Sequence, residues 1–133
     1  MVLATKCLEL SLPSIPSSVR VARGAVSEAI APFVSDELAD DVRLCVSEAV
    51  TNAVRHAYGP EVANGEVGVL VVRLEDELRV VVRDEGRGID EPPAGGGFGL
   101  QIIARVASRH TLHGGDSGTT VTMSFDLGRD GTD

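Results

Sequence analysis

Apolar and polar residues alternate along several parts of the chain, and this period of two predicts β-strands. The first such segment is Cys7–Leu12. Two Val-rich runs, Val67–Leu74 and Leu78–Asp84, follow near the middle, and the short acidic stretch between them predicts a hairpin. Near the C-terminus, His110–His113 and Thr119–Leu127 are expected to form a last pair of strands, joined by a glycine-rich turn.

Apolar residues recur at helical spacing in three other segments. The first runs from about Ser17 to Phe33. The second begins after Ser35 and ends near Tyr58, where a Gly-Pro pair stops it, and the third covers Phe98–Ser108. The order of elements predicts an α+β fold of the two-layer sandwich type. We expect three helices to cover one face of a mixed, mostly antiparallel sheet.

The composition is typical of one soluble domain. Hydrophobic residues make up 43% of the 133 residues and charged residues 24%. We expect a single domain over residues 1–128 and a frayed tail over residues 129–133. A net charge of -8 and 3% aromatic residues argue against a nucleic-acid partner. Neither a secretory leader nor an apolar run of roughly 20 residues is present, so we expect a cytoplasmic protein without a membrane partner.

Three polar side chains, Glu48, Asn52 and His56, lie four residues apart on the second predicted helix. They form one stripe beside the apolar stripe, where partial burial is costly unless something binds. The amide oxygen of Asn52 suits Mg²⁺, and Glu48 could accept a proton from an attacking hydroxyl or water. The alternative is a partly exposed helix face with three unrelated polar residues, and this helix alone does not decide between the two.

Asp84 ends the second Val-rich strand. Alternation places it on the same face as Val82 and opposite Arg83, so its carboxylate is expected to point inward. A buried carboxylate needs donors, and an adenine amino group is one candidate. Gly86 and Gly88 would then let the backbone turn sharply and pass close to a flat ligand. A salt-bridged Asp at a strand end, followed by a turn, is the alternative.

A glycine-rich run, Gly95–Leu100, leads into the third predicted helix. Glycines before a helix N-terminus form a natural anion site, although flexible linkers look the same. The run is neither a Walker A loop nor a Rossmann fingerprint. The histidines and cysteines form no recognisable zinc pattern, and His110 and His113 are interpreted as ordinary strand or turn residues.

Taken in order, these pieces resemble the GHKL family of ATPases and kinases, which share the Bergerat ATP-binding fold. Residues 48–57 look like its N-box, residues 84–88 like its first glycine box, residues 97–103 like its second, and residues 118–121 like its closing strand motif. Four motifs in this order are far more specific than any one of them. The short chain and the Glu-Ala-Val-Thr-Asn-Ala sequence most resemble the anti-sigma-factor serine/threonine kinases of bacteria.

The resemblance implies that the protein binds ATP with Mg²⁺. Asn52 would be the magnesium ligand and Glu48 the general base. Asp84 would receive the adenine amino group, and Thr119, which alternation turns inward, could join the adenine end. Either Arg55 or His56 could reach the phosphates. The remaining residues that the resemblance assigns to the ATP pocket are Gly86, Gly88, Gly97, Phe98, Gly99 and Leu100.

The resemblance also implies partners. The protein would phosphorylate a small anti-anti-sigma protein of the STAS type, sequester a sigma factor, and form a homodimer. One departure is that no Lys or Arg lies between Gly88 and Gly99. Phosphoryl transfer depends on neutralising the terminal phosphate, so an ATP-dependent regulator that grips its partner without modifying it remains an alternative. The catalytic domain of a histidine kinase is less favoured, because the chain lacks room for a phospho-accepting helical hairpin.

Overall fold

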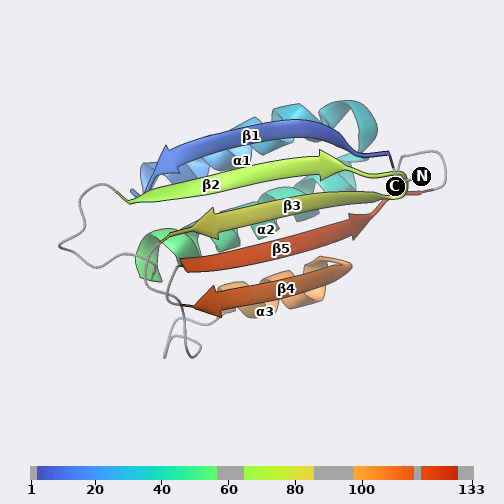
Figure 1. Cartoon of the computed structure of the whole chain (residues 1–133). Coiled ribbons are helices and arrows are strands. Elements are labelled where there is room, and N and C mark those ends of the chain that lie inside the picture. The colour runs from blue at the N-terminus through green and yellow to red at the C-terminus, as the bar shows by residue number, and fades with distance from the viewer. Residues whose placement is uncertain (1–2, 57–64, 86–97, 116–117, 129–133) are drawn as a thin grey trace.

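The computed structural model describes residues 3–56, 65–85, 98–115 and 118–128. In this part of the chain, three α-helices lie on one face of a five-stranded sheet, which gives two layers (Figure 1). No helix in the described ranges is long and apolar enough to cross a membrane. The elements are β1 (Thr5–Pro13), α1 (Ser17–Ile30), a 3-10 turn (Ala31–Phe33), α2 (Asp36–His56), β2 (Glu66–Arg73), β3 (Glu77–Asp84), α3 (Phe98–Val106), β4 (Arg109–Gly115) and β5 (Gly118–Asp126).

The strands lie in the order β1-β2-β3-β5-β4, and all four neighbouring pairs are antiparallel. The sequence predicts a mixed, mostly antiparallel sheet, and the structure differs in having no parallel pair among the described strands. The helices α1 and α2 run in opposite directions between β1 and β2, so β2 lies beside β1 and antiparallel to it (Figure 1). The strands β3 and β4 run the same way, but β5 lies between them and keeps each pairing antiparallel.

The central helix α2 starts where the sequence predicts. The Ser35 hydroxyl oxygen accepts a hydrogen bond of 3.1 Å from the backbone N–H of Leu38, which satisfies one of the free donors of the first turn. Asp36 and Glu37 add favourable charge at that end. Of the apolar stripe expected on α2, the described members are buried, and Ala57 lies outside the described residues. The buried members are Val42, Cys45, Val46, Ala49, Val50 and Ala53.

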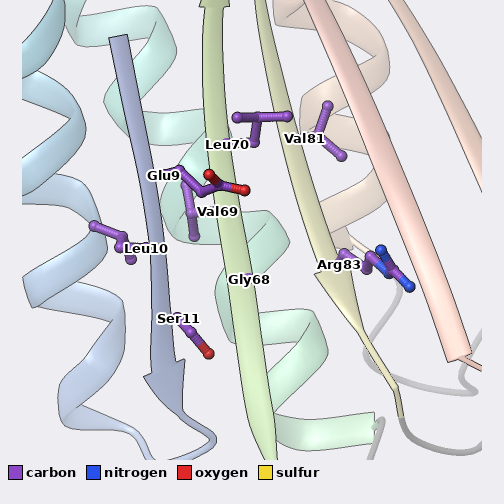
Figure 2. Close-up of a pocket in the computed structure, with 8 residues that line it drawn as sticks. All are labelled: Glu9, Leu10, Ser11, Gly68, Val69, Leu70, Val81 and Arg83. Carbon is purple, nitrogen blue, oxygen red and sulfur yellow. The ribbon is translucent and has the colours of Figure 1, made fainter. Parts of the chain in front are cut away.

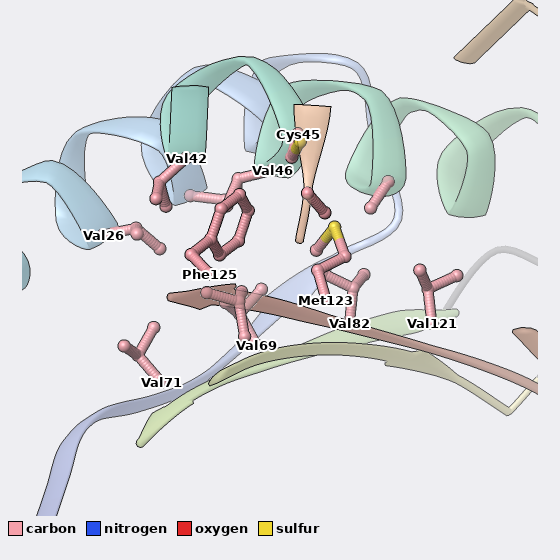
Figure 3. Close-up of a cluster of buried hydrophobic side chains, with 14 of the residues drawn as sticks. Val26, Val42, Cys45, Val46, Val69, Val71, Val82, Val121, Met123 and Phe125 are labelled. Atoms are coloured by element: carbon pink, nitrogen blue, oxygen red, sulfur yellow. The ribbon is translucent and has the colours of Figure 1, made fainter. Parts of the chain in front are cut away.

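The core lies between α2 and the inner face of the sheet. Val42 and Val46 face Phe125 of β5, and Met123 lies beside them (Figure 3). Along β3 and β5 the side chains alternate as predicted, so the two strands contribute two inward-facing rows. Each row is apolar except for one polar residue at its end, and the two polar residues lie at the same end of the sheet. The rows are Leu78, Val80, Val82 and Asp84 on β3, and Phe125, Met123, Val121 and Thr119 on β5.

Candidate functional site

Asp84 and Thr119 are direct partners in the pairing of β3 with β5. Both are almost wholly buried, with exposed fractions of 4% and 3%. The backbone N–H of Thr119 donates a hydrogen bond of 3.2 Å to Oδ1 of Asp84. The Thr119 hydroxyl oxygen is also buried, and it has no hydrogen-bond partner among the described residues. Because leaving a buried polar group unpaired is costly, this hydroxyl indicates a place where a ligand or water binds.

Gly118 permits this close pairing of the two strands. Its φ of +126° lies in the region that side chains rarely adopt, and a Cβ built there would lie 2.1 Å from the carbonyl oxygen of Asp84. In the sequence, Gly118 is recognisable only as part of a turn and a motif, and its steric role is not apparent. The signal that could have revealed it is a glycine directly before the inward-facing Thr119.

Glu48 and Asn52 lie one turn apart on α2. Both are half-buried and stand beside the buried residues Ala49 and Ala53, so they border the core as the helical pattern predicts. The helix packs across β3 and β5. The end of α2, the end of β3 and the start of β5 all lie at the same end of the molecule (Figure 1). The polar groups of the helix layer and the sheet layer are therefore gathered at one end of the fold.

The helix α3 begins against Glu48. A Cβ built on Gly99, the second residue of α3, would lie 2.9 Å from Oε2 of Glu48 and 3.6 Å from its Cβ. The start of α3 therefore packs against the Glu48 side chain of α2, from its Cβ to its carboxylate. The packing brings the Glu48 carboxylate next to Gly99, although the two residues are far apart in the sequence.

The structure separates the other predicted residues into three groups. Leu100 is half-buried and packs against the core, and Arg55 is exposed on α2. His56 ends α2 and Phe98 starts α3, but their side chains lie outside the described residues. Gly86, Gly88 and Gly97 lie wholly outside the described residues.

Cys45 lies three residues before Glu48 on α2, and its thiol is buried. Burial raises the pKa of this thiol to about 12, and the charges of Asp41 and Glu48 add to the effect. The thiol therefore stays protonated at physiological pH. A protonated, buried thiol is a poor nucleophile, and Cys45 packs as part of the core.

A separate hollow of about 500 Å³ lies on the opposite face of the sheet (Figure 2). It forms over Gly68 of β2, where no side chain fills the surface. Glu9 and Ser11 of β1 border it on one side, and Val81 and Arg83 of β3 border it on the other. Because this face points away from the helices, the hollow contains none of the residues predicted to bind nucleotide.

The fold and the order of motifs together define the class of protein. The chain belongs to the family of histidine kinase-like ATPase domains, whose sequence profile matches residues 12–125. The matched region contains both the α2 stripe and the Asp84–Thr119 pair. The resemblance to GHKL proteins and the predicted Bergerat fold are thereby confirmed.

Within this family, the chain is similar to serine-protein kinases named RsbW. It is 31% identical to the RsbW of Bacillus pumilus, in an alignment that covers 95% of this chain and 89% of the relative. It is 32% identical to the RsbW of Bacillus subtilis, where the alignment covers 88% of this chain and 83% of the relative. The similarity therefore extends over most of the length of both partners in each comparison.

Solved structures give the same fold. A structure of the RsbU and RsbW domains of Rv1364c from Mycobacterium tuberculosis matches with a TM-score of 0.71 at 24% identity over 89% of this chain, which spans 32% of that larger chain. The histidine kinase domain of the Erythrobacter litoralis EL346 blue-light activated histidine kinase matches with a TM-score of 0.63 at 25% identity, over 90% of this chain and 64% of that one. Both matches support the two-layer architecture.

Proposed function

We propose that this protein binds Mg·ATP and transfers its terminal phosphoryl group to a serine or threonine of a small anti-anti-sigma protein of the STAS type. We propose that the same protein also binds and sequesters a sigma factor. The family membership supports ATP binding, and the similarity to serine-protein kinases named RsbW over nearly the whole chain supports the kinase role.

The buried pair of Asp84 and Thr119 carries the proposal that a nucleotide binds here. The carboxylate of Asp84 offers acceptors for the amino group of adenine, and the Thr119 hydroxyl, which has no partner among the described residues, offers a further polar contact beside it. The buried Thr119 hydroxyl, at the end of an otherwise apolar row, is costly to bury without such a partner. A flat base with an exocyclic donor fits this combination.

Asn52 and Glu48 would serve the phosphate end of the nucleotide. The amide oxygen of Asn52 is a hard ligand of the kind that Mg²⁺ prefers, and the bound ion would neutralise charge on the phosphates. The Glu48 carboxylate would accept the proton of the attacking hydroxyl. Because Glu48 lies against the start of α3, phosphates bound at that helix would stand near another anion, and this favours a cation between them. Arg55 or His56 would add positive charge, and Gly86, Gly88, Gly97, Phe98, Gly99 and Leu100 would shape the pocket.

The kinase role is tested with radiolabelled ATP and the cognate anti-anti-sigma protein. Wild type should label the partner, and Glu48→Gln should bind Mg·ATP yet transfer phosphate at least about 100-fold more slowly, as expected for loss of a general base. Glu75→Gln makes the same chemical change at an exposed position in the turn between β2 and β3 and should transfer normally. Absence of labelling by wild type, or equal labelling by Glu48→Gln, contradicts the role.

A second candidate function is an ATP-dependent regulator that grips its partner without modifying it. The segment between Gly88 and Gly99 favours it, because that segment contains no Lys or Arg to hold the terminal phosphate during transfer. Pull-downs of the partner with and without Mg·ATP test this function. Partner binding that requires Mg·ATP, without any labelling of the partner, would support this function. Partner binding that is the same with and without Mg·ATP would contradict it.

We also propose that the protein acts in the cytoplasm. It does not bind nucleic acid, in keeping with its net charge of -8. We propose further that it forms a homodimer. The open sheet face suits a two-fold contact, because Glu9 and Arg83 lie on opposite sides of the same hollow (Figure 2). In a two-fold arrangement, Glu9 of one copy could meet Arg83 of the other. Sedimentation should show a wild-type dimer that Arg83→Glu weakens, and a monomeric wild type would contradict the proposal.

A further inference from the structure

Gly99 lies so close to Glu48 that a side chain at residue 99 and the Glu48 carboxylate could not both keep their present places. A Cβ there would lie 2.9 Å from Oε2 of Glu48, 3.6 Å from its Cβ and 3.8 Å from its Cδ. Carbon atoms in favourable contact stand about 3.5–4.0 Å apart, and a Cβ essentially never lies within 3.0 Å of another heavy atom of this kind. The shortest of the three distances is therefore a clash, and a methyl group at residue 99 must displace something.

The two helix backbones are poorly placed to move. The helix α3 is fixed to the core by Ile103, which is fully buried, and by Leu100, which packs against the core. On the other side, Ala49 and Val50 fix α2 next to Glu48. Interiors packed to this density resist shifts of whole elements. The Glu48 carboxylate, in contrast, stands at the end of a side chain with rotatable bonds, so it is the group that a methyl at residue 99 would displace.

We infer that Gly99 is a positioning residue that keeps the Glu48 carboxylate in its place beside the start of α3. The consequence for catalysis rests on the proposed kinase function. A general base must lie within about 2.6–3.2 Å of the atom that carries the proton, and a misplacement of about 1 Å can lower a rate about 100-fold. Gly99 thus acts on transfer through Glu48, in addition to the pocket-shaping role that the family resemblance implies.

Gly99→Ala and Gly24→Ala form a matched pair of variants. Both replace a glycine within a helix, but a Cβ at Gly24 in α1 would have no atom within 4 Å. For Gly99→Ala we expect the rate of phosphoryl transfer at saturating ATP to fall at least tenfold, a loss beyond any change in the Kd for ATP, which calorimetry measures separately. Gly24→Ala should match wild type in both. Normal transfer by Gly99→Ala, or a loss that its weaker ATP binding fully accounts for, overturns the inference.

A second measurement reads the position of Glu48 without any catalysis. The carboxyl carbon of Glu48 is followed by NMR in ¹³C-labelled, nucleotide-free protein and is assigned with Glu48→Gln. Its chemical shift should change in Gly99→Ala and stay as in wild type in Gly24→Ala. An unchanged shift in Gly99→Ala overturns the inference even if transfer is slow. If wild type transfers no phosphate, the proposed function fails, and this measurement alone decides whether Gly99 positions Glu48.

Discussion

Gly118 and Asp84 meet where β5 begins beside the end of β3, and the space between them admits no side chain. The carbonyl oxygen of Asp84 lies 2.1 Å from where the Cβ of residue 118 would be, and φ at Gly118 is +126°. The backbone at this point therefore depends on glycine. Thr119 follows directly and pairs with Asp84, so glycine at residue 118 permits the close approach of the two strands beside the buried polar pair.

Gly118→Ala should destabilise the protein by at least about 2 kcal/mol, because it combines an unfavourable backbone conformation with overpacking against the backbone. Urea unfolding followed by circular dichroism measures the loss. Gly24→Ala is the matched control and should raise stability by about 0.5–1 kcal/mol, since alanine is favoured within a helix and nothing there obstructs it. Equal stability of Gly118→Ala and wild type would contradict the steric role of Gly118.

Thr119→Val should change stability and nucleotide affinity in opposite directions. The hydroxyl oxygen of Thr119 is buried without a protein partner among the described residues, so its replacement by a methyl group should stabilise the nucleotide-free protein by about 1 kcal/mol. If the hydroxyl contacts the adenine end of ATP, the same change should weaken binding several-fold in calorimetry. Thr122→Val, on the other face of β5, is the control for both measurements. A destabilised variant with normal affinity would argue against the assignment.

Asp84→Asn should weaken ATP binding at least tenfold, or about 1.4 kcal/mol, because the amide turns one acceptor of the carboxylate into a donor facing the adenine amino group. Calorimetry with Mg·ATP measures the effect. Asp126→Asn makes the same change at an exposed position on β5 and should bind ATP normally. If Asp84→Asn bound ATP as tightly as wild type, this carboxylate would not bind the adenine amino group.

Asn52→Ala should also weaken binding of Mg·ATP about tenfold or more, since it removes an oxygen ligand of the ion. Its affinity for ATP in the presence of EDTA should differ little from that of wild type, because no magnesium is then bound. This difference separates a metal ligand from a residue that merely supports the helix. An equal loss of affinity with and without magnesium would exclude the ligand role.

The periodicity of the sequence predicts most of the fold. The inward rows of β3 and β5 follow from strict alternation, and this alone places Asp84 and Thr119 on the helix-covered face. The first helix is shorter than its pattern suggests, because Pro32 lacks the N–H that an α-helix needs, and the chain continues as the 3-10 turn Ala31–Phe33. Local patterns decide these features, so a single sequence is sufficient for them.

The contacts within the site are less accessible to prediction. The approach of Gly99 to Glu48 depends on how α3 packs on α2, and no local pattern records a distance between two helices. The insertion of β5 between β3 and β4 likewise results from tertiary pairing. Glu48 and Gly99 are therefore predictable only as separate candidates, and the structure shows that they lie in contact.

Glu77 is the centre of a charge network at the far end of the sheet from Asp84. Its carboxylate accepts hydrogen bonds from Ser124 at 2.8 Å, from Arg79 at 2.9 Å and from Arg109 at 3.1 Å. Burial alone would raise the pKa of Glu77, but these hydrogen bonds and the charge of Arg79 outweigh it and hold the pKa below its ordinary value of 4.5. The folded state therefore favours the ionised carboxylate.

The pH dependence of stability follows from this direction. A carboxyl whose pKa is lowered by folding stabilises the protein above its ordinary pKa, and this contribution is lost as the pH falls through the lower folded value. Glu77→Gln should thus cost about 1 kcal/mol near neutral pH, and the difference from wild type should shrink as the pH drops below about 4. Urea unfolding across this pH range measures it, with Glu75→Gln as the exposed control. A difference that grows toward acid pH would mean that folding raises the pKa of Glu77.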